Sequence, residues 1–142
     1  MNIDTLQDEI EQEFEMFDEW MQKYEHLIAL GKELPLIDAQ FKDDDHLIKG
    51  CQSRVWLQAE LEHDRVRFTA DSDAIITKGI ISLLVRVLDN QHPDDILSAD
   101  LAFIDRIGLK EHLSPTRANG LLSMVKQMKF YALGFKSKLE QS

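Results

Sequence analysis

Cys51 is the residue of this chain best suited to nucleophilic chemistry, because it is the single cysteine and it directly follows a glycine. Gly50 tolerates backbone angles closed to other residues, so it allows the sharp turn that places a side chain at a loop tip. Lys49 and Arg54 flank the thiol, and nearby positive charge increases the thiolate fraction of a group whose pKa is about 8.5. The local sequence predicts a reactive thiol. The alternative is a buried cysteine that acts only as a small hydrophobic side chain.

The elements after Cys51 must position this thiol, and they predict a β-hairpin. Apolar and polar side chains alternate from Val55 to Glu62 and again after Asp64, which is the period of half-buried strands. A two-residue turn at positions 63–64 would place Glu62 opposite Arg65 and Glu60 opposite Arg67. Opposite charges then meet across the pair, which supports this register.

Helices are expected on both sides of the hairpin. Apolar residues at helical spacing predict a helix behind an Asp4 cap, a second helix after Asp18 that ends with Gly31 as its C-terminal cap, and a strongly apolar helix capped by Ser72 and Asp73. Gly79 within the third of these suggests the close approach of another backbone, although simple tolerance of a glycine is equally compatible.

A final long helix is expected to begin where Ser114 caps and Pro115 occupies the first turn. Its predicted buried stripe consists of Leu121, Leu122, Val125, Met128 and Ala132. The expected fold class is α+β, with an antiparallel β-sheet packed with helices in one domain that spans residues 1–142.

The composition restricts the kinds of partner and cofactor. A net charge of −10 argues against nucleic acid and against an anionic membrane, since both require a basic protein surface. The longest uncharged apolar run, residues 79–85, is too short to span a bilayer, and the polar start predicts no signal peptide, so we expect a cytoplasmic protein. One cysteine excludes a four-cysteine metal site, and four of the histidines lack metal-ligand spacing: His26, His46, His63 and His92.

The first residues of the chain are strongly acidic. Residues 1–19 contain no lysine or arginine, but they include Asp4, Asp8, Glu9, Glu11, Glu13, Glu15, Asp18 and Glu19. Such a run is typical of a solvated helix face, and the alternative is a docking surface for a basic partner.

Three segments together resemble the SufE family of sulfur acceptor proteins, in the family's order and at its spacing. They are Gly50-Cys51-Gln52-Ser53-Arg54-Val55-Trp56, Asp71-Ser72-Asp73-Ala74 with Lys78-Gly79, and His112-Leu113-Ser114-Pro115 with Arg117 and Gly120-Leu121. The resemblance covers nearly the whole chain and implies a SufE/NifU-like two-layer fold.

The resemblance also implies a function in iron-sulfur cluster assembly. A SufS-type cysteine desulfurase, which uses pyridoxal phosphate, would transfer persulfide sulfur to Cys51, and the sulfur would pass to a SufBCD scaffold complex. The protein itself would bind no cofactor and no metal, and it would activate the desulfurase rather than act as an enzyme. An alternative is a CsdE-like carrier that serves a different desulfurase.

Other residues of the matching segments receive less specific roles. Gly50, Gln52 and Ser53 are expected to shape the loop, the last two through hydrogen bonds, and Trp56 to pack beneath it. Two further classes stay open from the residues alone. A scaffold like IscU would need more cysteine ligands than one, and a cysteine hydrolase would pair Cys51 with His112.

Four residues outside the loop have two expected roles each. Asp71 and Asp73 either contact the partner or cap the following helix. Arg117 either stabilises an anion near the cysteine or forms a salt bridge with an acid. His112 is either a general base or an ordinary surface histidine.

Overall fold

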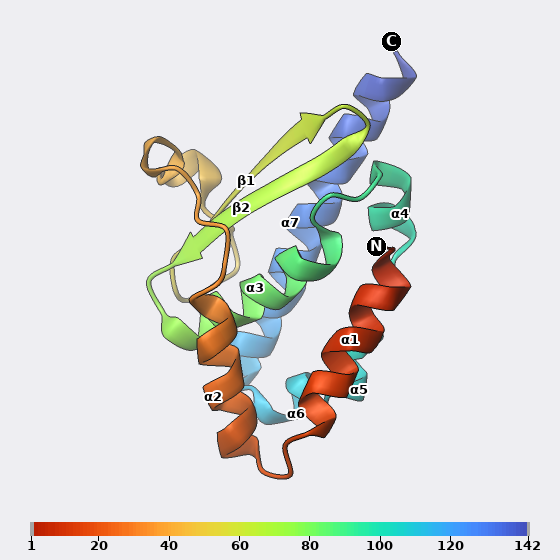
Figure 1. The fold of residues 1–142 in the computed structure, drawn as a ribbon. Helices are drawn as coiled ribbons and strands as arrows, with labels where there is room; N and C mark the ends of the chain where they lie inside the picture. The colour runs from red at the N-terminus through yellow and green to blue at the C-terminus, as the bar shows by residue number, and fades with distance from the viewer. Residues whose placement is uncertain (1, 142) are drawn as a thin grey trace.

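The computed structural model describes residues 2–141, which form helices arranged around one β-hairpin (Figure 1). In chain order the elements are α1 (Ile3–Glu15), α2 (Trp20–Gly31), the short 3-10 helices η1 (Ala39–Phe41) and η2 (Asp44–His46), β1 (Val55–Glu62), β2 (Arg65–Ser72), α3 (Ile75–Leu88), α4 (Pro93–Ser98), α5 (Phe103–Arg106), α6 (Leu109–His112) and α7 (Pro115–Glu140). The expected α+β class is confirmed, and within residues 2–141 the sheet has only the two strands. No helix in this part of the chain is long and apolar enough to cross a membrane.

The hairpin has the register expected from its charges. β1 and β2 are antiparallel, with Glu62 opposite Arg65 and Glu60 opposite Arg67. The inward side chains Val55, Leu57, Val66, Phe68 and Ala70 are all buried. The ion pair that forms is diagonal, between Arg67 and Glu62 at 3.7 Å, and within residues 2–141 Glu60 forms none. Alternating burial therefore specifies this register more directly than the charges do.

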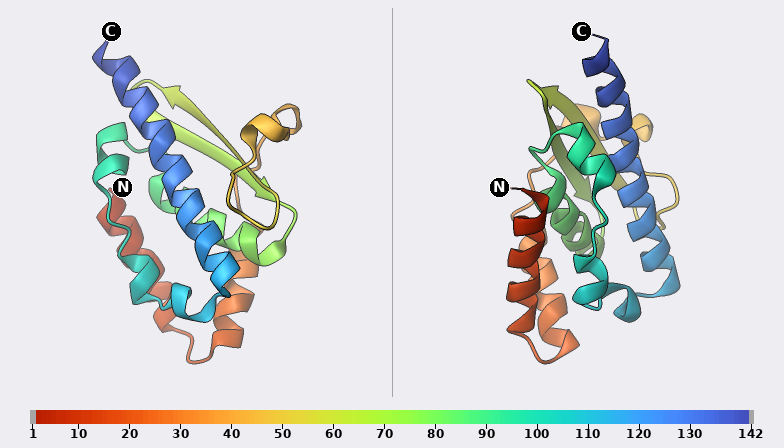
Figure 2. Two further views of the ribbon diagram at one scale, coloured as in Figure 1. Left: turned by 180° about the vertical axis from the view of Figure 1, so that it is seen from behind. Right: turned by 90° about the vertical axis from the view of Figure 1, so that its right-hand side faces the viewer.

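Helix α3 is the centre of the core, as its apolar sequence predicts. It contacts α1, α2, α7 and β2, and most of its side chains are buried. Seen from behind, α7 runs across the back of the molecule over α3 and the hairpin (Figure 2). The long helix thus brings its first turns to the same end of the molecule as the start of β1.

Two glycines allow α2 and α3 to cross at short distance. A Cβ atom at Gly79 would collide with the backbone carbonyl of Leu27, so the suggested close backbone approach is confirmed. A Cβ atom at Gly31 would lie only 3.1 Å from the backbone nitrogen of Gly79. The expectation that Gly31 caps α2 is wrong, because Gly31 is the last helical residue and Lys32 follows in a right-handed conformation. Gly31 is required by helix packing rather than by chain reversal.

Helix caps were predicted correctly only for α7. There the Ser114 hydroxyl accepts from the Arg117 N–H, with Pro115 in the first turn. Helix α1 is capped by Asn2, which accepts from the Thr5 N–H, and not by Asp4. The cap lies earlier than the apolar pattern indicated, because Ile3 also joins the buried face.

The starts of α2 and α3 are capped differently from each other. Helix α2, expected after Asp18, is capped by Glu19 and Gln22, whose side chains each accept a hydrogen bond from the other's backbone. Helix α3 follows Ala74 and has no side-chain cap. The Asp73 carboxylate instead accepts from the Arg54 N–H. The Ser72 hydroxyl donates to the Arg54 carbonyl and accepts from the Ala74 N–H, which precedes the helix.

The buried stripe of α7 is rotated from the expected one. Gly120, Leu121, Met124, Met128 and Ala132 are buried, whereas Leu122 is 52% exposed and Val125 is only partly buried. The prediction for Leu122 is wrong because Leu121 and Leu122 both fit an apolar stripe. Which of the two is buried depends on where α3 and the segment around Cys51 pack against the helix.

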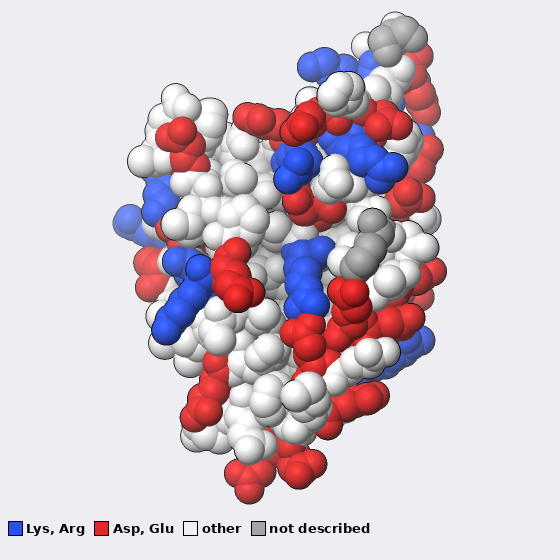
Figure 3. Space-filling view, in the orientation of Figure 1, with Lys and Arg blue, Asp and Glu red and all other residues white. Residues whose placement is uncertain are grey.

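The acidic N-terminal residues have partly structural roles. Arg86 of α3 forms ion pairs with Glu9 and Glu13, and Arg106 of α5 pairs with Glu11 at 3.3 Å. The lower part of the molecule around α1 is rich in acidic side chains with a few basic ones between them (Figure 3). The acidic run therefore attaches α1 to neighbouring helices and leaves the remaining acids exposed to solvent.

Candidate functional site

Residues 49–54, termed the cysteine loop, lie between η2 and β1. The Ile48 N–H donates to the Val55 carbonyl at 2.9 Å and closes the loop at its neck. Gly50 has a φ of 93°, the positive value that its position before Cys51 suggested. A Cβ atom at Gly50 would collide with the Ser123 hydroxyl, so the loop rests directly on α7. The loop therefore has a fixed neck and a tip that lies against a helix.

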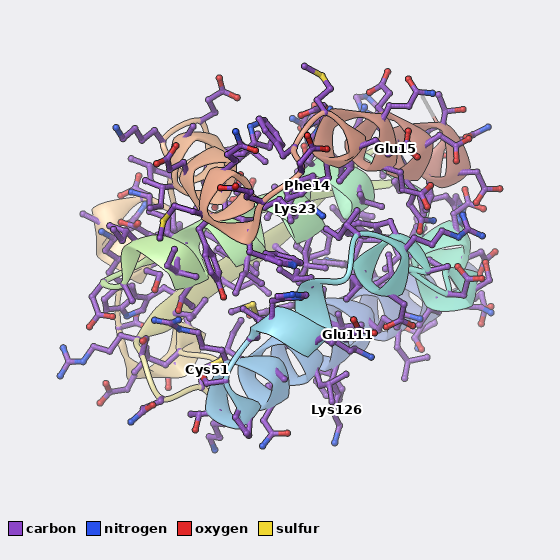
Figure 4. The ribbon with its side chains drawn as sticks, turned by 90° about the horizontal axis from the view of Figure 1, so that it is seen from below. Phe14, Glu15, Lys23, Cys51, Glu111 and Lys126 are labelled. Atoms are coloured by element: carbon purple, nitrogen blue, oxygen red, sulfur yellow. The ribbon has the colours of Figure 1, made fainter. Side chains whose placement is uncertain are left out.

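The Cys51 thiol is half-buried at the tip of this loop, beside the first turns of α7 (Figure 4). Its S–H donates to the Gly120 carbonyl at an S···O distance of 3.5 Å. Burial raises the pKa of the Cys51 thiol above its ordinary value. The expected activation by Lys49 and Arg54 is not seen, because both residues are exposed and burial raises the pKa of the thiol rather than lowering it. Water screens exposed charges, whereas burial disfavours the thiolate directly.

The thiol opens into a cavity of about 330 Å³ between three elements. The cysteine loop, the first turns of α3 and the start of α7 provide its lining: Cys51, Gln52, Ser53, Thr77, Ile80, Ser114, Thr116, Arg117, Gly120 and Met124. Segments that are far apart in the sequence thus surround one sulfur atom with polar and apolar groups. Such a cavity can shelter an atom attached to the sulfur from bulk water.

Arg117 is the one lysine or arginine among the described residues that line this cavity. Within residues 2–141 no carboxylate forms an ion pair with its guanidinium. Of the two roles expected for Arg117, the salt bridge is therefore not formed in this part of the chain. The arrangement is a sheltered thiol with a cation nearby, which suits a sulfur nucleophile whose reacting form is an anion.

Comparison with known proteins places the chain in a family. Residues 8–132 match the SufE family, described as an Fe-S metabolism associated domain. The chain belongs to the SufE family. It is 40% identical over 134 residues to SufE-like protein 1, chloroplastic/mitochondrial, of Arabidopsis thaliana, covering 94% of this chain but only 36% of that protein. It is 35% identical over 135 residues to an uncharacterized SufE-like protein of Rhizobium meliloti, covering 92% and 96% of the two chains.

A solved structure is similar to this SufE-family fold at low sequence identity. The solution structure of a hypothetical protein from Thermus thermophilus has a TM-score of 0.77 and 18% identity, covering 93% of this chain and 96% of the other. The likeness supports the fold alone. The family membership and the expected fold are both confirmed, and neither assigns a role to a single residue.

The loop neighbours of Cys51 in this SufE-family protein are placed differently from their expected roles. Gln52 and Ser53 line the cavity, but within residues 2–141 neither forms a hydrogen bond. Trp56 does not line the cavity: it forms a β-bridge with Leu47, and the Lys42 ammonium lies 5.4 Å from its ring centre. Trp56 therefore supports the segment that leads into the cysteine loop.

Asp71 joins this incoming segment to α3. Its buried carboxylate forms ion pairs with Lys42 at 2.5 Å and Lys78 at 3.2 Å. Burial acts to raise the pKa of Asp71, but hydrogen bonds from Lys42, Ser72 and Lys78 outweigh it and leave the pKa below its ordinary value. Asp71 therefore remains ionised and connects the segment before Cys51 to the helix that lines the cavity.

Asp73 and His112 lie outside the cavity lining. The Asp73 carboxylate accepts from the Arg54 N–H at 3.1 Å and so holds the last residue of the cysteine loop. The His112 ring stacks on Trp20 with 3.8 Å between ring centres, and its Nδ1 lies 3.1 Å from the Gly108 carbonyl oxygen. The geometry gives His112 a packing role, and it does not bring a histidine to the thiol as a cysteine hydrolase would require.

Four residues that line the cavity lie outside the matching segments: Thr77, Ile80, Thr116 and Met124. Thr77 and Ile80 are three residues apart on α3, and Gly120 and Met124 are four apart on α7, so each pair shares a helix face. The helical spacing was readable from the sequence. Which face meets Cys51 was not, because that depends on how the two helices pack.

Proposed function

We propose that this SufE-family protein accepts sulfur on Cys51 from a cysteine desulfurase and activates that enzyme. One observation carries the proposal: the single cysteine lies at a loop tip, half-buried, in a cavity that also contains Arg117. A hydrolase would need a base beside the thiol, and His112 lies outside the cavity lining. Sulfur transfer needs only one nucleophile on the acceptor.

The chemistry is a thiol exchange in which atoms and charge balance. The Cys51 thiolate attacks the outer sulfur of the donor's cysteine persulfide, and a new sulfur–sulfur bond forms on Cys51. The sulfur–sulfur bond of the donor breaks, and the donor cysteine leaves as a thiolate. No electrons are gained or lost overall, and no resolving cysteine is present in the chain to release the sulfur as a disulfide.

The cysteine loop provides a means of presenting the thiol. Its neck is closed by the Ile48–Val55 hydrogen bond, and Asp73 holds the Arg54 N–H. Between these points, in the described chain, the loop residues form only the Cys51–Gly120 hydrogen bond. A docked desulfurase can therefore draw out the loop tip while the rest of the fold stays in place, which also removes the burial that disfavours the thiolate.

Arg117 is proposed to stabilise the sulfur anion near the cavity. Its guanidinium has no carboxylate partner within residues 2–141, so it can pair with a thiolate or persulfide anion without breaking a salt bridge. The variant Arg117→Met would then slow sulfur acceptance while the free energy of unfolding changes little.

The proposed partners follow from the family. The donor would be a SufS-type desulfurase that carries pyridoxal phosphate, and the recipient a SufBCD scaffold complex in the cytoplasm, where thiols stay reduced. The protein itself would hold no cofactor or metal. A CsdE-like carrier that serves a different desulfurase is the alternative, and it uses the same thiol chemistry on Cys51.

Intact-mass analysis tests the proposal. The native chain and Cys51→Ser are each incubated with a SufS-type desulfurase, pyridoxal phosphate and cysteine. We expect the native chain to gain one or more sulfur atoms and Cys51→Ser to gain none. No gain on the native chain, tried with an active SufS-type enzyme and with the desulfurase that a CsdE-like carrier serves, would exclude the acceptor function.

A further inference from the structure

The two edges of the hairpin differ in how they are covered. On β2, Val66 exchanges hydrogen bonds with residues 90 and 91 at 2.8 and 2.9 Å, and Ala70 exchanges hydrogen bonds with Pro35 and Ile37 at 3.1 Å each. The Phe68 N–H donates to the Asp89 carboxylate at 2.7 Å. The outward N–H groups of Val66, Phe68 and Ala70 therefore all have partners on the outer edge of β2.

These contacts fix the direction of the backbone groups on β1. The backbone N–H and C=O groups of residues 66, 68 and 70 point away from β1. Across the hairpin these residues lie opposite Leu61, Ala59 and Leu57. In an antiparallel pair, opposite residues either exchange both hydrogen bonds or neither, so these three residues of β1 point away from β2. The outer edge of β1 thus consists of the amide groups of Leu57, Ala59 and Leu61.

Only the first part of this edge is covered. The Val55 carbonyl accepts from Ile48, and the Leu57 carbonyl accepts from the Tyr131 hydroxyl at 3.5 Å. Beyond that point, no residue of the described range 2–141 pairs with the outward N–H and C=O groups of Ala59 and Leu61.

An exposed aromatic side chain adjoins this edge. Phe130 is 68% exposed and precedes Tyr131, whose hydroxyl lies at the Leu57 carbonyl. Phe130 also lines a mainly polar groove of about 520 Å³ with Leu47, which forms a bridge with Trp56 of β1; the other lining residues are Asp44, Asp45, Lys49, Ser123, Lys126 and Gln127. A chain segment laid along β1 would therefore find an aromatic side chain on the α7 side.

We infer that the outer edge of β1 binds an extended segment of a partner protein as an added strand. Main-chain hydrogen bonds to Ala59 and Leu61 would supply the register, and alternate apolar side chains would cover Phe130. The opposite face of the added strand would be basic. It would meet Glu60, which accepts only the Gln58 amide at 3.1 Å and forms no ion pair within residues 2–141.

The charge of the chain favours such a basic segment over a second copy of the protein. Each copy carries a net charge of −10, and pairing two β1 strands would bring the Glu60 and Glu62 side chains of both copies together. Acidic residues on an unpaired edge also oppose self-association through that edge. The open edge at Ala59 and Leu61 includes no residue of the cysteine loop, so the inference is independent of the proposed sulfur chemistry.

Amide hydrogen exchange and NMR titration test the inference on the full chain. The probe is a capped peptide of alternating valine and lysine. In the free protein the Ala59 and Leu61 amides should exchange quickly and the Gln58 and Glu60 amides slowly. The peptide should protect Ala59 and Leu61, with chemical-shift changes that extend to Phe130.

The controls alter either the peptide or the protein. N-methylation of the peptide amides that face β1 should weaken binding by about a factor of ten, and methylation of the opposite amides should leave it unchanged. Ala59→Pro removes an outward N–H without removing a hairpin hydrogen bond, and should weaken binding similarly. Glu60→Lys should reverse the preference toward a valine–glutamate peptide, and Cys51→Ser should bind like the native chain.

Three outcomes would overturn the inference. The first is equal affinity for the two methylated peptides, because binding would then not use the strand edge. The second is a shift pattern confined to the acidic helix α1. The third is protection of Ala59 and Leu61 that rises with protein concentration in the absence of peptide, which would assign the edge to a second copy of the chain.

Discussion

Replacement of Gly120 tests directly whether the Cys51 side chain packs against α7. A methyl group at position 120 would lie 3.5 Å from the Cys51 sulfur, which is ordinary van der Waals contact, so no atom has to move. Alanine also favours a helix over glycine by about 1 kcal/mol. Gly120→Ala should therefore raise the free energy of unfolding by up to about 1 kcal/mol. It should also slow alkylation of Cys51, because the methyl group covers part of the thiol.

Two further variants separate helix propensity from contact with the thiol. Gly134 lies on the same helix and has no atom within 4 Å of an added Cβ, so Gly134→Ala should stabilise α7 without changing the alkylation rate. Gly120→Val adds two methyl groups beyond a first carbon that already lies 3.5 Å from the Cys51 sulfur and 3.9 Å from its Cβ. This overpacking should cost about 1–3 kcal/mol and displace the loop tip, so that alkylation becomes faster.

The assay combines urea unfolding with the rate of iodoacetamide reaction, followed by intact mass at one pH. The expected order of alkylation rates is Gly120→Val fastest, native and Gly134→Ala equal, and Gly120→Ala slowest. The reasoning is refuted if Gly120→Ala reacts as fast as the native chain. It is also refuted if Gly120→Ala destabilises the protein while Gly134→Ala stabilises it.

Three further predictions concern the loop and its supports. Gly50→Ala should lower the free energy of unfolding by at least about 1–2 kcal/mol, because φ is positive and the new methyl group meets Ser123; an unchanged urea midpoint would contradict this. Asp71→Asn should lower the free energy of unfolding by about 1–3 kcal/mol at neutral pH, because it removes the ion pairs with Lys42 and Lys78. The native chain has this stabilisation above the unfolded carboxyl pKa of about 3.9 and loses it as pH falls through the lower folded pKa, so the two proteins should become equally stable in strong acid. A difference that persists in strong acid would argue against this charge pairing. Because burial raises the pKa of the Cys51 thiol, the thiol ionises at a lower pH in the unfolded chain than in the folded one. The native chain should therefore lose stability relative to Cys51→Ser as pH rises above about 8.5. Stability curves that stay parallel for the two proteins would count against burial of the thiol.

The hairpin and the start of α7 were predictable because local chemistry determines them. The alternation from Val55 to Glu62 and the opposite charges at its end specify one register, and the structure has that register. Ser114 followed by a proline provides a cap and a first turn without help from other elements. Local patterns are reliable where one element, or two strands joined by a tight turn, contains all the interacting groups.

Predictions failed where side chains had a choice of partners. Asp73 was expected at the start of α3, but its carboxylate binds the Arg54 N–H, nineteen positions away along the chain. Leu122 and Met124 are both apolar, and only the packing of α7 decides which of them is buried. The basic neighbours of Cys51 were expected to activate the thiol, yet their side chains are exposed and burial raises its pKa. Each failure depends on a contact between segments that sequence spacing cannot rank.

The distribution of contacts around the cysteine loop explains how a stable fold can contain a mobile nucleophile. Strong interactions lie just outside the loop: Asp71 pairs with two lysines, and Ile48 binds Val55. The tip has one S–H···O contact, and hydrogen bonds with sulfur are weak. Movement of the tip therefore breaks little of what holds the sheet to α3, so the cost of exposing the thiol is mainly the loss of its packing against Gly120. A partner that supplies apolar contact at the cavity can offset that cost without unfolding either helix.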